Sequence, residues 1–220
     1  MKNDLVLRNR YLDQYKDIYG DNIYLSSIES VNNKINTIKG GSKFTAFYNL
    51  IKDCKDCAYN NSDVDFGVGN ENSKIVFITE AICKGDYYHY NSLTGDVGQL
   101  FDKILSAINL SRKDIYILYL FKYIPSKNSD SYQTEIRICE YHLQQQLKII
   151  NPNLIVALGE DVGKKILNVN QSVENSNGNI HKLEDFDLMI THHPVAILEN
   201  SKLKKSTWND YKNIRDNYLN

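Results

Sequence analysis

Residues 154–158 read LIVAL, and this stretch decides the fold of the chain. It is apolar at every position rather than at every second one, which is typical of a strand that is buried on both faces of a sheet. Gly159 follows directly, and a helical pattern of apolar residues runs over 160–167. A buried strand joined by a tight turn to a helix is the unit from which parallel α/β sheets are built.

Three more apolar runs share this pattern, at 75–79, 115–121 and 188–191. Helical patterns separate the runs at 97–108 and 134–150, and a final helical pattern covers about 207–218. Buried strands that alternate with helices favour a doubly wound sheet with helices on both faces. We therefore predict an α/β fold with three α/β/α layers and a central four-stranded parallel sheet.

The first part of the chain has a different pattern. Two amphipathic helical patterns, at 5–19 and 26–38, end at Gly40 and Gly41, which are natural helix stops. The 220 residues, of which 42% are hydrophobic, are enough to bury one core. We predict a helical N-terminal extension over 1–41 and a single α/β domain over 42–220.

Composition and charge limit the class of protein. A formal net charge of -1 excludes a globally basic protein, so contact with a nucleic acid requires a local basic patch. No apolar run approaches the roughly 18 residues of a membrane span, and the first residues lack the apolar segment of a secretory signal. We expect a cytoplasmic, monomeric protein without membrane contact.

In doubly wound folds, ligands bind beyond the carboxyl ends of the strands. The residues at or just after the predicted strand ends are Glu80, those at 119–122, Gly159, His192 and His193. We expect these residues to converge on one site.

A series of short motifs carries a family resemblance. In chain order they are Cys54-x2-Cys57, Phe66-Gly-Val-Gly-Asn70, Glu80-Ala81, Gly95-x2-Gly98-x-Leu100, Lys122-x2-Pro125 with Asn128, Cys139, the stretch 151–159, Thr191-His-His-Pro194 and Trp208-x-Asp210. Their order and spacing resemble the iron-sulfur uracil-DNA glycosylases, the family-4 branch of the uracil-DNA glycosylase superfamily, over about residues 44–218. The resemblance implies a DNA repair enzyme that binds DNA and hydrolyses the N-glycosidic bond of a flipped-out base.

The resemblance also implies catalytic residues. Glu80 stands at the glutamate of the family's first active-site loop, Asp86 at a second acidic position and His193 at the His-Pro motif. Glycosidic cleavage passes through an oxocarbenium-like sugar, so it needs a carboxylate that activates water or stabilises positive charge. The departing base needs a hydrogen-bond donor, which a histidine supplies. No lysine nucleophile is indicated, so we expect a monofunctional glycosylase.

The base pocket departs from the family. Ala81 is kept, but Ile82 and Cys83 replace a Pro-Gly pair, Leu93 replaces the phenylalanine that stacks on uracil, and Tyr119 replaces the asparagine that reads its polar edge. Stacking contributes about 1 to 3 kcal/mol per base, and a matched polar edge discriminates strongly between bases. We therefore expect a damaged or modified base rather than plain uracil, such as a hypermodified pyrimidine of phage DNA.

Contact with the DNA backbone is expected from lysines. Lys122 lies in one matching motif, and Lys202, Lys204 and Lys205 follow the His-Pro motif, where the family meets DNA phosphates. Glu199 stands where the family often has arginine, which removes one expected contact.

The cysteines also depart from the family, which holds a four-iron cluster with four cysteines. Cys54, Cys57 and Cys139 match, but Tyr123 takes the fourth position. His142 follows Cys139 by three residues on the same helical face, so these three cysteines and His142 can form a Cys3His zinc site. Zinc, a cluster with three cysteine ligands and the absence of a metal remain open as alternatives.

Two other functions compete with the enzyme. One is a catalytically silent module that uses the glycosylase fold to bind nucleic acid or protein, and the other is catalysis on RNA or a free nucleoside. The sequence favours the enzyme because Glu80, Asp86 and His193 are kept while their neighbours have changed.

Overall fold

The computed structural model describes residues 42–51, 67–81, 93–121, 132–167, 178–183 and 185–219. The chain divides into two compact units, Met1–Ile51 and Lys52–Asn220. In the first unit, helix α3 (Lys43–Ile51) begins where the Ser42 hydroxyl accepts hydrogen bonds from the backbone N–H groups of Phe44 and Thr45. The helices expected at 5–19 and 26–38 lie outside the described residues, and the expected domain boundary after residue 41 stays a prediction.

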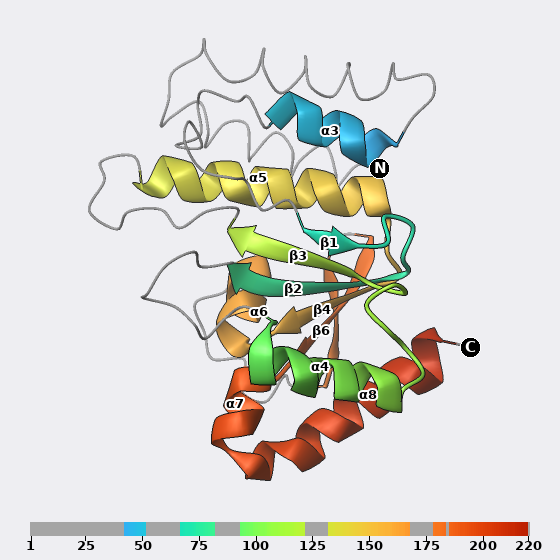
Figure 1. Cartoon of the computed structure of the whole chain (residues 1–220). Helices are drawn as coiled ribbons and strands as arrows, with labels where there is room; N and C mark the ends of the chain where they lie inside the picture. The colour runs from blue at the N-terminus through green and yellow to red at the C-terminus, as the bar shows by residue number, and fades with distance from the viewer. Residues whose placement is uncertain are drawn as a thin grey trace. The chain divides into compact units, whose positions relative to one another are not determined.

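The second unit is built on a six-stranded sheet (Figure 1). Its strands, in the order in which they lie side by side, are β1 (Val68–Gly69), β3 (Tyr116–Phe121), β2 (Ile75–Ala81), β4 (Leu154–Leu158), β6 (Phe186–Thr191) and β5 (Ile180–Leu183). The four central strands are parallel, whereas β1 and β5 pair antiparallel at the two edges. The predicted four-stranded parallel core is thus confirmed, and two short edge strands extend it.

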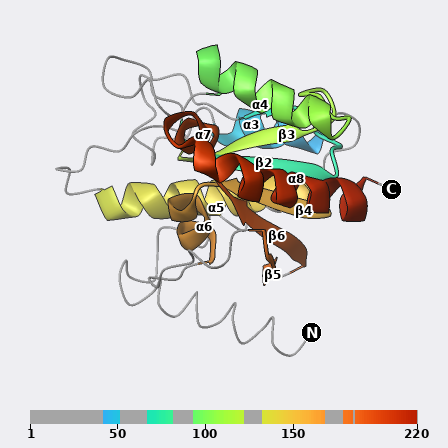
Figure 2. The ribbon, with the colours of Figure 1, turned by 90° about the horizontal axis from the view of Figure 1, so that it is seen from below.

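The helices of this unit form the outer layers of the α/β/α arrangement. Among the described residues they are α4 (Gly95–Ala107), α5 (Tyr132–Ile150), α6 (Glu160–Leu167), α7 (Pro194–Glu199) and α8 (Lys204–Tyr218), with a 3-10 turn, η2 (Ser201–Leu203), before α8. Figure 1 shows α5 on one side of the sheet and α4 and α8 on the other, and Figure 2 shows α8 crossing in front of the strands. None of the helices among the described residues is long and apolar enough to cross a membrane.

The main core lies between the sheet and the α4/α8 layer. The Phe77 ring of β2 contacts the Phe101 ring of α4 edge to face, with 5.2 Å between centroids, and stacks on the Tyr211 ring of α8 at 6.2 Å. Such ring pairs add geometric preference to the burial of apolar area. These contacts hold α4 and α8 to the centre of the sheet.

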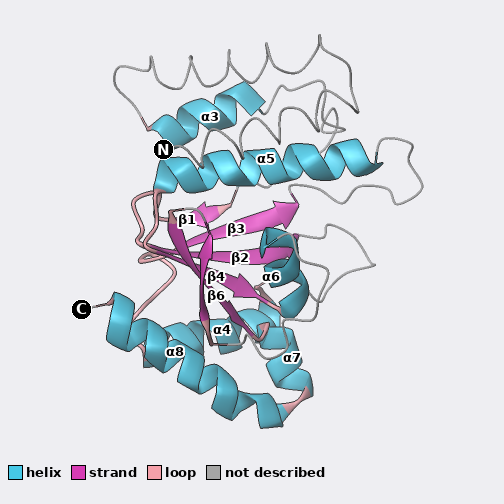
Figure 3. Ribbon diagram, turned by 180° about the vertical axis from the view of Figure 1, so that it is seen from behind, coloured by secondary structure: helices cyan, strands magenta, loops and turns pink. Residues whose placement is uncertain are grey.

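The turn at Gly159 places α6 on the face of the sheet that is opposite to α4 and α8. Gly159 has a φ of 103°, a conformation that favours glycine, and α6 begins at the next residue. Further along α6, a Cβ added to Gly163 would lie 2.5 Å from Cδ1 of Ile190 in β6, so glycine lets the helix approach the strand closely. Figure 3 shows α6 at the edge toward which β2, β3 and β4 point.

Candidate active site

Two of the predicted catalytic residues, Glu80 and His193, lie at the carboxyl ends of central strands. Glu80 lies near the end of β2, and His193 follows β6 by two residues. Thr79, the residue before Glu80, lies with its hydroxyl oxygen 3.3 Å from Nε2 of His193. His193 therefore reaches the end of β2, close enough for the charge of Glu80 to act on its ring, and Thr79 is an addition that the family motifs did not indicate. Asp86 lies outside the described residues.

The surroundings of His193 determine which ring nitrogen carries the proton. His193 is the N-cap of α7, and its Nδ1 accepts a hydrogen bond of 3.2 Å from the backbone N–H of Val195. A backbone N–H can only donate, so Nδ1 is the unprotonated nitrogen and Nε2 carries the hydrogen of the neutral ring. Nε2–H therefore donates toward the Thr79 hydroxyl oxygen.

Burial keeps the His193 ring neutral. Loss of solvent lowers the pKa of His193 from 6.5 to about 4, although the negative charge of Glu80 opposes part of this shift. The imidazole is therefore uncharged at neutral pH and acts as a hydrogen-bond donor rather than as a cation. A neutral histidine is a suitable donor to an oxygen on which negative charge develops.

Glu80 forms an ion pair with a residue that no sequence motif marks. Nζ of Lys165, on α6, lies 2.9 Å from Oε1 of Glu80. The same ammonium lies over the ring of Phe121, at the end of β3, at 4.6 Å from the centroid. The sequence gives no local signal for Lys165, because its partner lies 85 residues away.

Two predicted base-pocket residues, Leu93 and Tyr119, are each only 6% exposed and belong to the main core cluster. Tyr119 is the β3 partner of Thr79 in the sheet register, so both side chains point to the same face as neighbours. Ala81 ends β2 opposite Phe121. Ile82 and Cys83 lie outside the described residues.

The backbone of Leu93 is fixed from two sides. Nη2 of Arg112 donates a hydrogen bond of 2.7 Å to the Leu93 carbonyl, while Nε of Arg112 pairs with Asp102 of α4 at 2.6 Å. A Cβ added to Gly98 would lie 2.5 Å from the same carbonyl oxygen. Gly98 belongs to one of the family motifs, whereas Arg112 belongs to none of them.

A second network supports the end of β6. The Thr191 hydroxyl donates a hydrogen bond of 2.6 Å to Oδ2 of Asp210, a residue of α8. Burial raises the pKa of Asp210, and this hydrogen bond and the charge of His192 oppose the shift. This link holds α8 to the residue that precedes the two histidines, which gives the Trp208-x-Asp210 motif a structural role.

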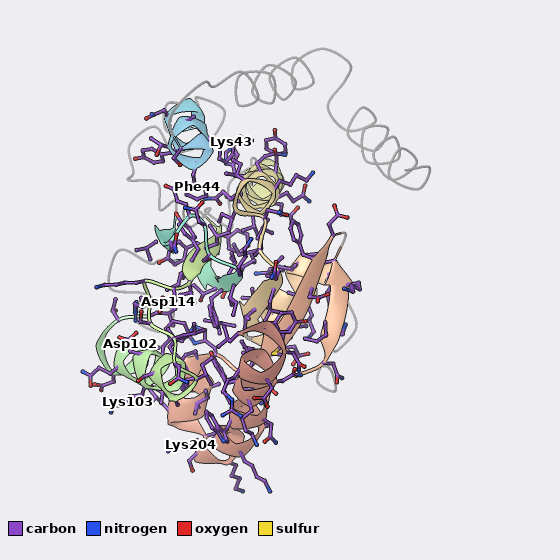
Figure 4. All side chains as sticks on the ribbon, turned by 90° about the vertical axis from the view of Figure 1, so that its right-hand side faces the viewer. Lys43, Phe44, Asp102, Lys103, Asp114 and Lys204 are labelled. Atoms are coloured by element: carbon purple, nitrogen blue, oxygen red, sulfur yellow. The ribbon has the colours of Figure 1, made fainter. Side chains whose placement is uncertain are left out.

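Three of the four expected phosphate-binding lysines lie near one another in the chain. Lys202 lies in η2, and Lys204 and Lys205 open α8, as Figure 4 shows for Lys204. Asn200 caps η2 by accepting a hydrogen bond of 3.1 Å from the backbone N–H of Lys202. The first turn of α8 contains no acidic residue. Lys122 lies outside the described residues.

Two of the four expected metal ligands are described. Cys139 and His142 lie one helical turn apart on α5, and both are buried. A buried thiol and imidazole at this spacing fit the donor chemistry of zinc or of a cluster. The other two expected ligands, Cys54 and Cys57, lie outside the described residues.

Comparison with known proteins identifies the family. Residues 66–212 match the family described as the Uracil DNA glycosylase superfamily. The type-4 uracil-DNA glycosylase of Archaeoglobus fulgidus is 29% identical over 174 residues, which cover 74% of this chain and 87% of that protein. That of Thermotoga maritima is 31% identical over 159 residues, covering 68% and 80%, and that of Saccharolobus solfataricus is 28% identical over 159 residues, covering 68% and 74%. With the family match spanning most of the chain and these relatives aligned over most of their own length, this chain belongs to the uracil-DNA glycosylase superfamily.

Proposed function

We propose that this protein hydrolyses the N-glycosidic bond of a base flipped out of DNA, and that the base is a modified or damaged one rather than plain uracil. The enzyme class, a DNA glycosylase, follows from the family. The observation that best supports the proposed chemistry is the neutral His193, whose Nε2–H donor lies at the end of β2 next to Glu80.

Glu80 and His193 have separate roles in the proposed reaction. Hydrolysis breaks the bond between C1′ and the base nitrogen, the base leaves with the electron pair, and the oxygen of water bonds to C1′. The Glu80 carboxylate stabilises the positive sugar or accepts the proton of the water. Nε2–H of His193 turns from Thr79 to the oxygen of the departing base. Asp86 is proposed as a second carboxylate.

The proposed substrate rests on the pocket residues. Leu93 offers an aliphatic side chain instead of an aromatic face, so a flat base loses stacking there. Tyr119 offers a phenol rather than the paired donor and acceptor of an amide, so it reads a different edge. Both changes favour a base with altered substituents, and a modified pyrimidine is the proposed class.

The test is a base-release assay under single-turnover conditions. Matched duplexes and single strands carry uracil, hypoxanthine, hydroxymethylcytosine or glucosylated hydroxymethylcytosine, and wild type is compared with Glu80→Gln. We expect release of one of the non-uracil bases to exceed release of uracil, and Glu80→Gln to release it about 100- to 10,000-fold more slowly.

Each part of the proposal can fail separately. Faster release of uracil than of the other bases would reject the modified-base substrate alone. Equal inactivity on every oligonucleotide, with equal DNA binding by wild type and Glu80→Gln, would instead identify a binding module.

We further propose a metal centre at Cys54, Cys57, Cys139 and His142, occupied by zinc or by an iron-sulfur cluster. The buried pair of donors on α5 supports it. The family resemblance implies a cluster held by four cysteines, whereas this chain offers three cysteines at the matching positions and, in addition, His142. The role proposed for the centre here is structural, because no step of the reaction above uses it.

A further inference from the structure

We propose that Lys165 is a positioning residue for Glu80, holding the carboxylate in place before the substrate binds. This inference rests on the proposed function, because it assigns to Lys165 a role only through the catalytic use of Glu80. The relevant observations are the ion pair between the two residues and the place of Lys165 on a helix that packs unusually close to the sheet.

The close packing of α6 brings Lys165 to the strand ends. Gly163 lies against Ile190 of β6, where an added Cβ would be 2.5 Å from Cδ1 of the isoleucine. Because Ile190 lies between Met189, which faces the α4/α8 core, and Thr191, which bonds to α8, its side chain points to the opposite face. The helix α6 therefore lies on the side of the sheet away from α8, and the Lys165 side chain extends from this helix to Glu80.

Two contacts fix the ammonium group. Nζ of Lys165 lies 2.9 Å from Oε1 of Glu80 and 4.6 Å from the centroid of the Phe121 ring. A cation over a ring face gains electrostatic attraction, and the ring also limits the conformations of the long lysine side chain. The lysine thus joins the ends of β2 and β3 to α6.

The neighbouring lysine forms an ion pair within α6 and serves for comparison. Lys164 pairs with Glu160 at 2.7 Å, one turn earlier on the same helix, which is a common arrangement on helix surfaces. Lys165 instead bonds to a residue of another element, 85 positions away. The side chains of Lys165 and Glu80 are 40% and 38% exposed, so their pairing contributes little to folding stability.

The proposed effect of the ion pair is to orient the Glu80 carboxylate. An ion pair on one oxygen restricts the rotamers of a glutamate near the end of a strand. A charged group that is already in place when the sugar becomes positive lowers the barrier, since the protein need not reorganise during the reaction. Lys165 therefore acts on the rate of base release and not on the affinity for DNA.

The experiment compares Lys165→Met with the matched control Lys164→Met on the same helix. Single-turnover base release is measured on the oligonucleotide from which wild type releases the base fastest. Affinity is measured on a duplex that carries a tetrahydrofuran abasic analogue. We expect Lys165→Met to lower the release rate about 10- to 100-fold, the cost of a small misplacement of a catalytic group, with unchanged affinity. Lys164→Met should behave as wild type, and Lys165→Arg should recover part of the rate.

A double variant separates positioning from other roles. If Lys165 acts through Glu80, adding Lys165→Met to Glu80→Gln has no further effect on the residual rate or on binding. Additive effects would overturn the inference, and so would a Lys165→Met rate equal to that of the control. Weaker binding with a smaller salt dependence would instead make Lys165 a phosphate contact and also overturn it.

Failure of the inference and failure of the proposed function give different results. An active wild type, a strongly slowed Glu80→Gln and an unaffected Lys165→Met reject only the positioning role. A wild type that releases none of the four bases rejects the proposed function, and the positioning role with it.

Discussion

At the scale of single residues, one histidine combines three constraints. His193 caps α7 through Nδ1, directs Nε2–H toward Thr79 and is kept neutral by burial. Its neighbour His192 is half-buried and interacts electrostatically with Asp210 instead. Two adjacent histidines of the same sequence pattern thus have different surroundings, because the chain turns from β6 into α7 between them.

We predict different effects of replacing these two histidines. His193→Ala removes the proposed donor for the departing base and should lower the single-turnover release rate about 100- to 1000-fold, the usual cost of removing one such donor. His192→Ala is the matched control and should change the rate far less. Equal reductions in the two variants, measured on the same oligonucleotide, would contradict the assignment of the donor to His193.

The pKa of His193 also predicts a pH dependence of stability. In the unfolded chain the His193 imidazole binds a proton near pH 6.5. In the folded protein its pKa is lowered to about 4, so it binds the proton only at lower pH. The unfolded state is therefore favoured as the pH falls through this window, and above pH 6.5 the residue has no effect. Wild type should lose up to about 3 kcal/mol of its free energy of unfolding between pH 7 and pH 4 because of this one group. Urea unfolding should show a smaller loss for His193→Gln, and parallel pH curves would refute the prediction.

At the scale of elements, the start of α4 and the loop before α8 carry the site's supporting contacts. The α4 helix begins two residues after Leu93, and its Gly98 lies against the Leu93 carbonyl. The η2 turn and the start of α8 present Lys202, Lys204 and Lys205. The start of α4 supports the predicted base pocket, and the segment before α8 is the expected contact with the DNA backbone.

The variant Gly98→Ala tests the contact between the start of α4 and the Leu93 carbonyl. Alanine normally stabilises a helix relative to glycine by about 1 kcal/mol. Here the new Cβ would lie 2.5 Å from a backbone oxygen of Leu93, so the backbone must move. We expect a net destabilisation of about 1 to 3 kcal/mol in denaturant unfolding and slower base release. Gln99→Ala, an exposed change on the same helix, serves as the control, and a stabilised Gly98→Ala variant would show that the pocket tolerates the shift.

The expected contact with the DNA backbone is tested by a triple variant in which glutamine replaces Lys202, Lys204 and Lys205. Removing one lysine–phosphate interaction should reduce the slope of log affinity against log salt by about 0.9 on duplex DNA. We expect weaker binding at low salt and a smaller slope, measured by fluorescence anisotropy. Lys103→Gln with Lys113→Gln, on exposed positions elsewhere, is the charge control, and an equal change in slope there would argue against a specific contact.

At the scale of the whole molecule, the helix α5 connects the sheet to the proposed metal centre. Its buried Cys139 and His142 would join ligands from residues 54 and 57, which precede the sheet in the chain. Such a centre links distant segments and therefore contributes to folding stability when metal is bound.

Metal analysis of the purified protein tests this centre. We expect either about one equivalent of zinc without colour or iron and sulfide with visible absorption. Cys139→Ser and His142→Ala should each lower the metal content and the melting temperature, whereas Cys83→Ser should leave the metal content unchanged. A metal content that His142→Ala leaves intact would reject the histidine as a ligand.

Much of the fold followed from the sequence because its strongest signals are local. Strands buried on both faces read as continuous apolar runs, so the four parallel strands and the helices between them were predicted within a few residues of their observed bounds. The edge strands β1 and β5 were missed, because two or four residues with largely exposed side chains carry no such signal and form only by pairing with β3 and β6.

The candidate site divides in the same way. The sequence by itself determined the family pattern, the strand-end positions of Glu80 and His193, and the changes at Leu93 and Tyr119. Only the tertiary structure decided that Thr79 meets His193, that Arg112 holds Leu93 and that Lys165 holds Glu80. These contacts join residues 19 to 114 positions apart. Their partners are set by how strands and helices pack, and no spacing along the chain encodes that.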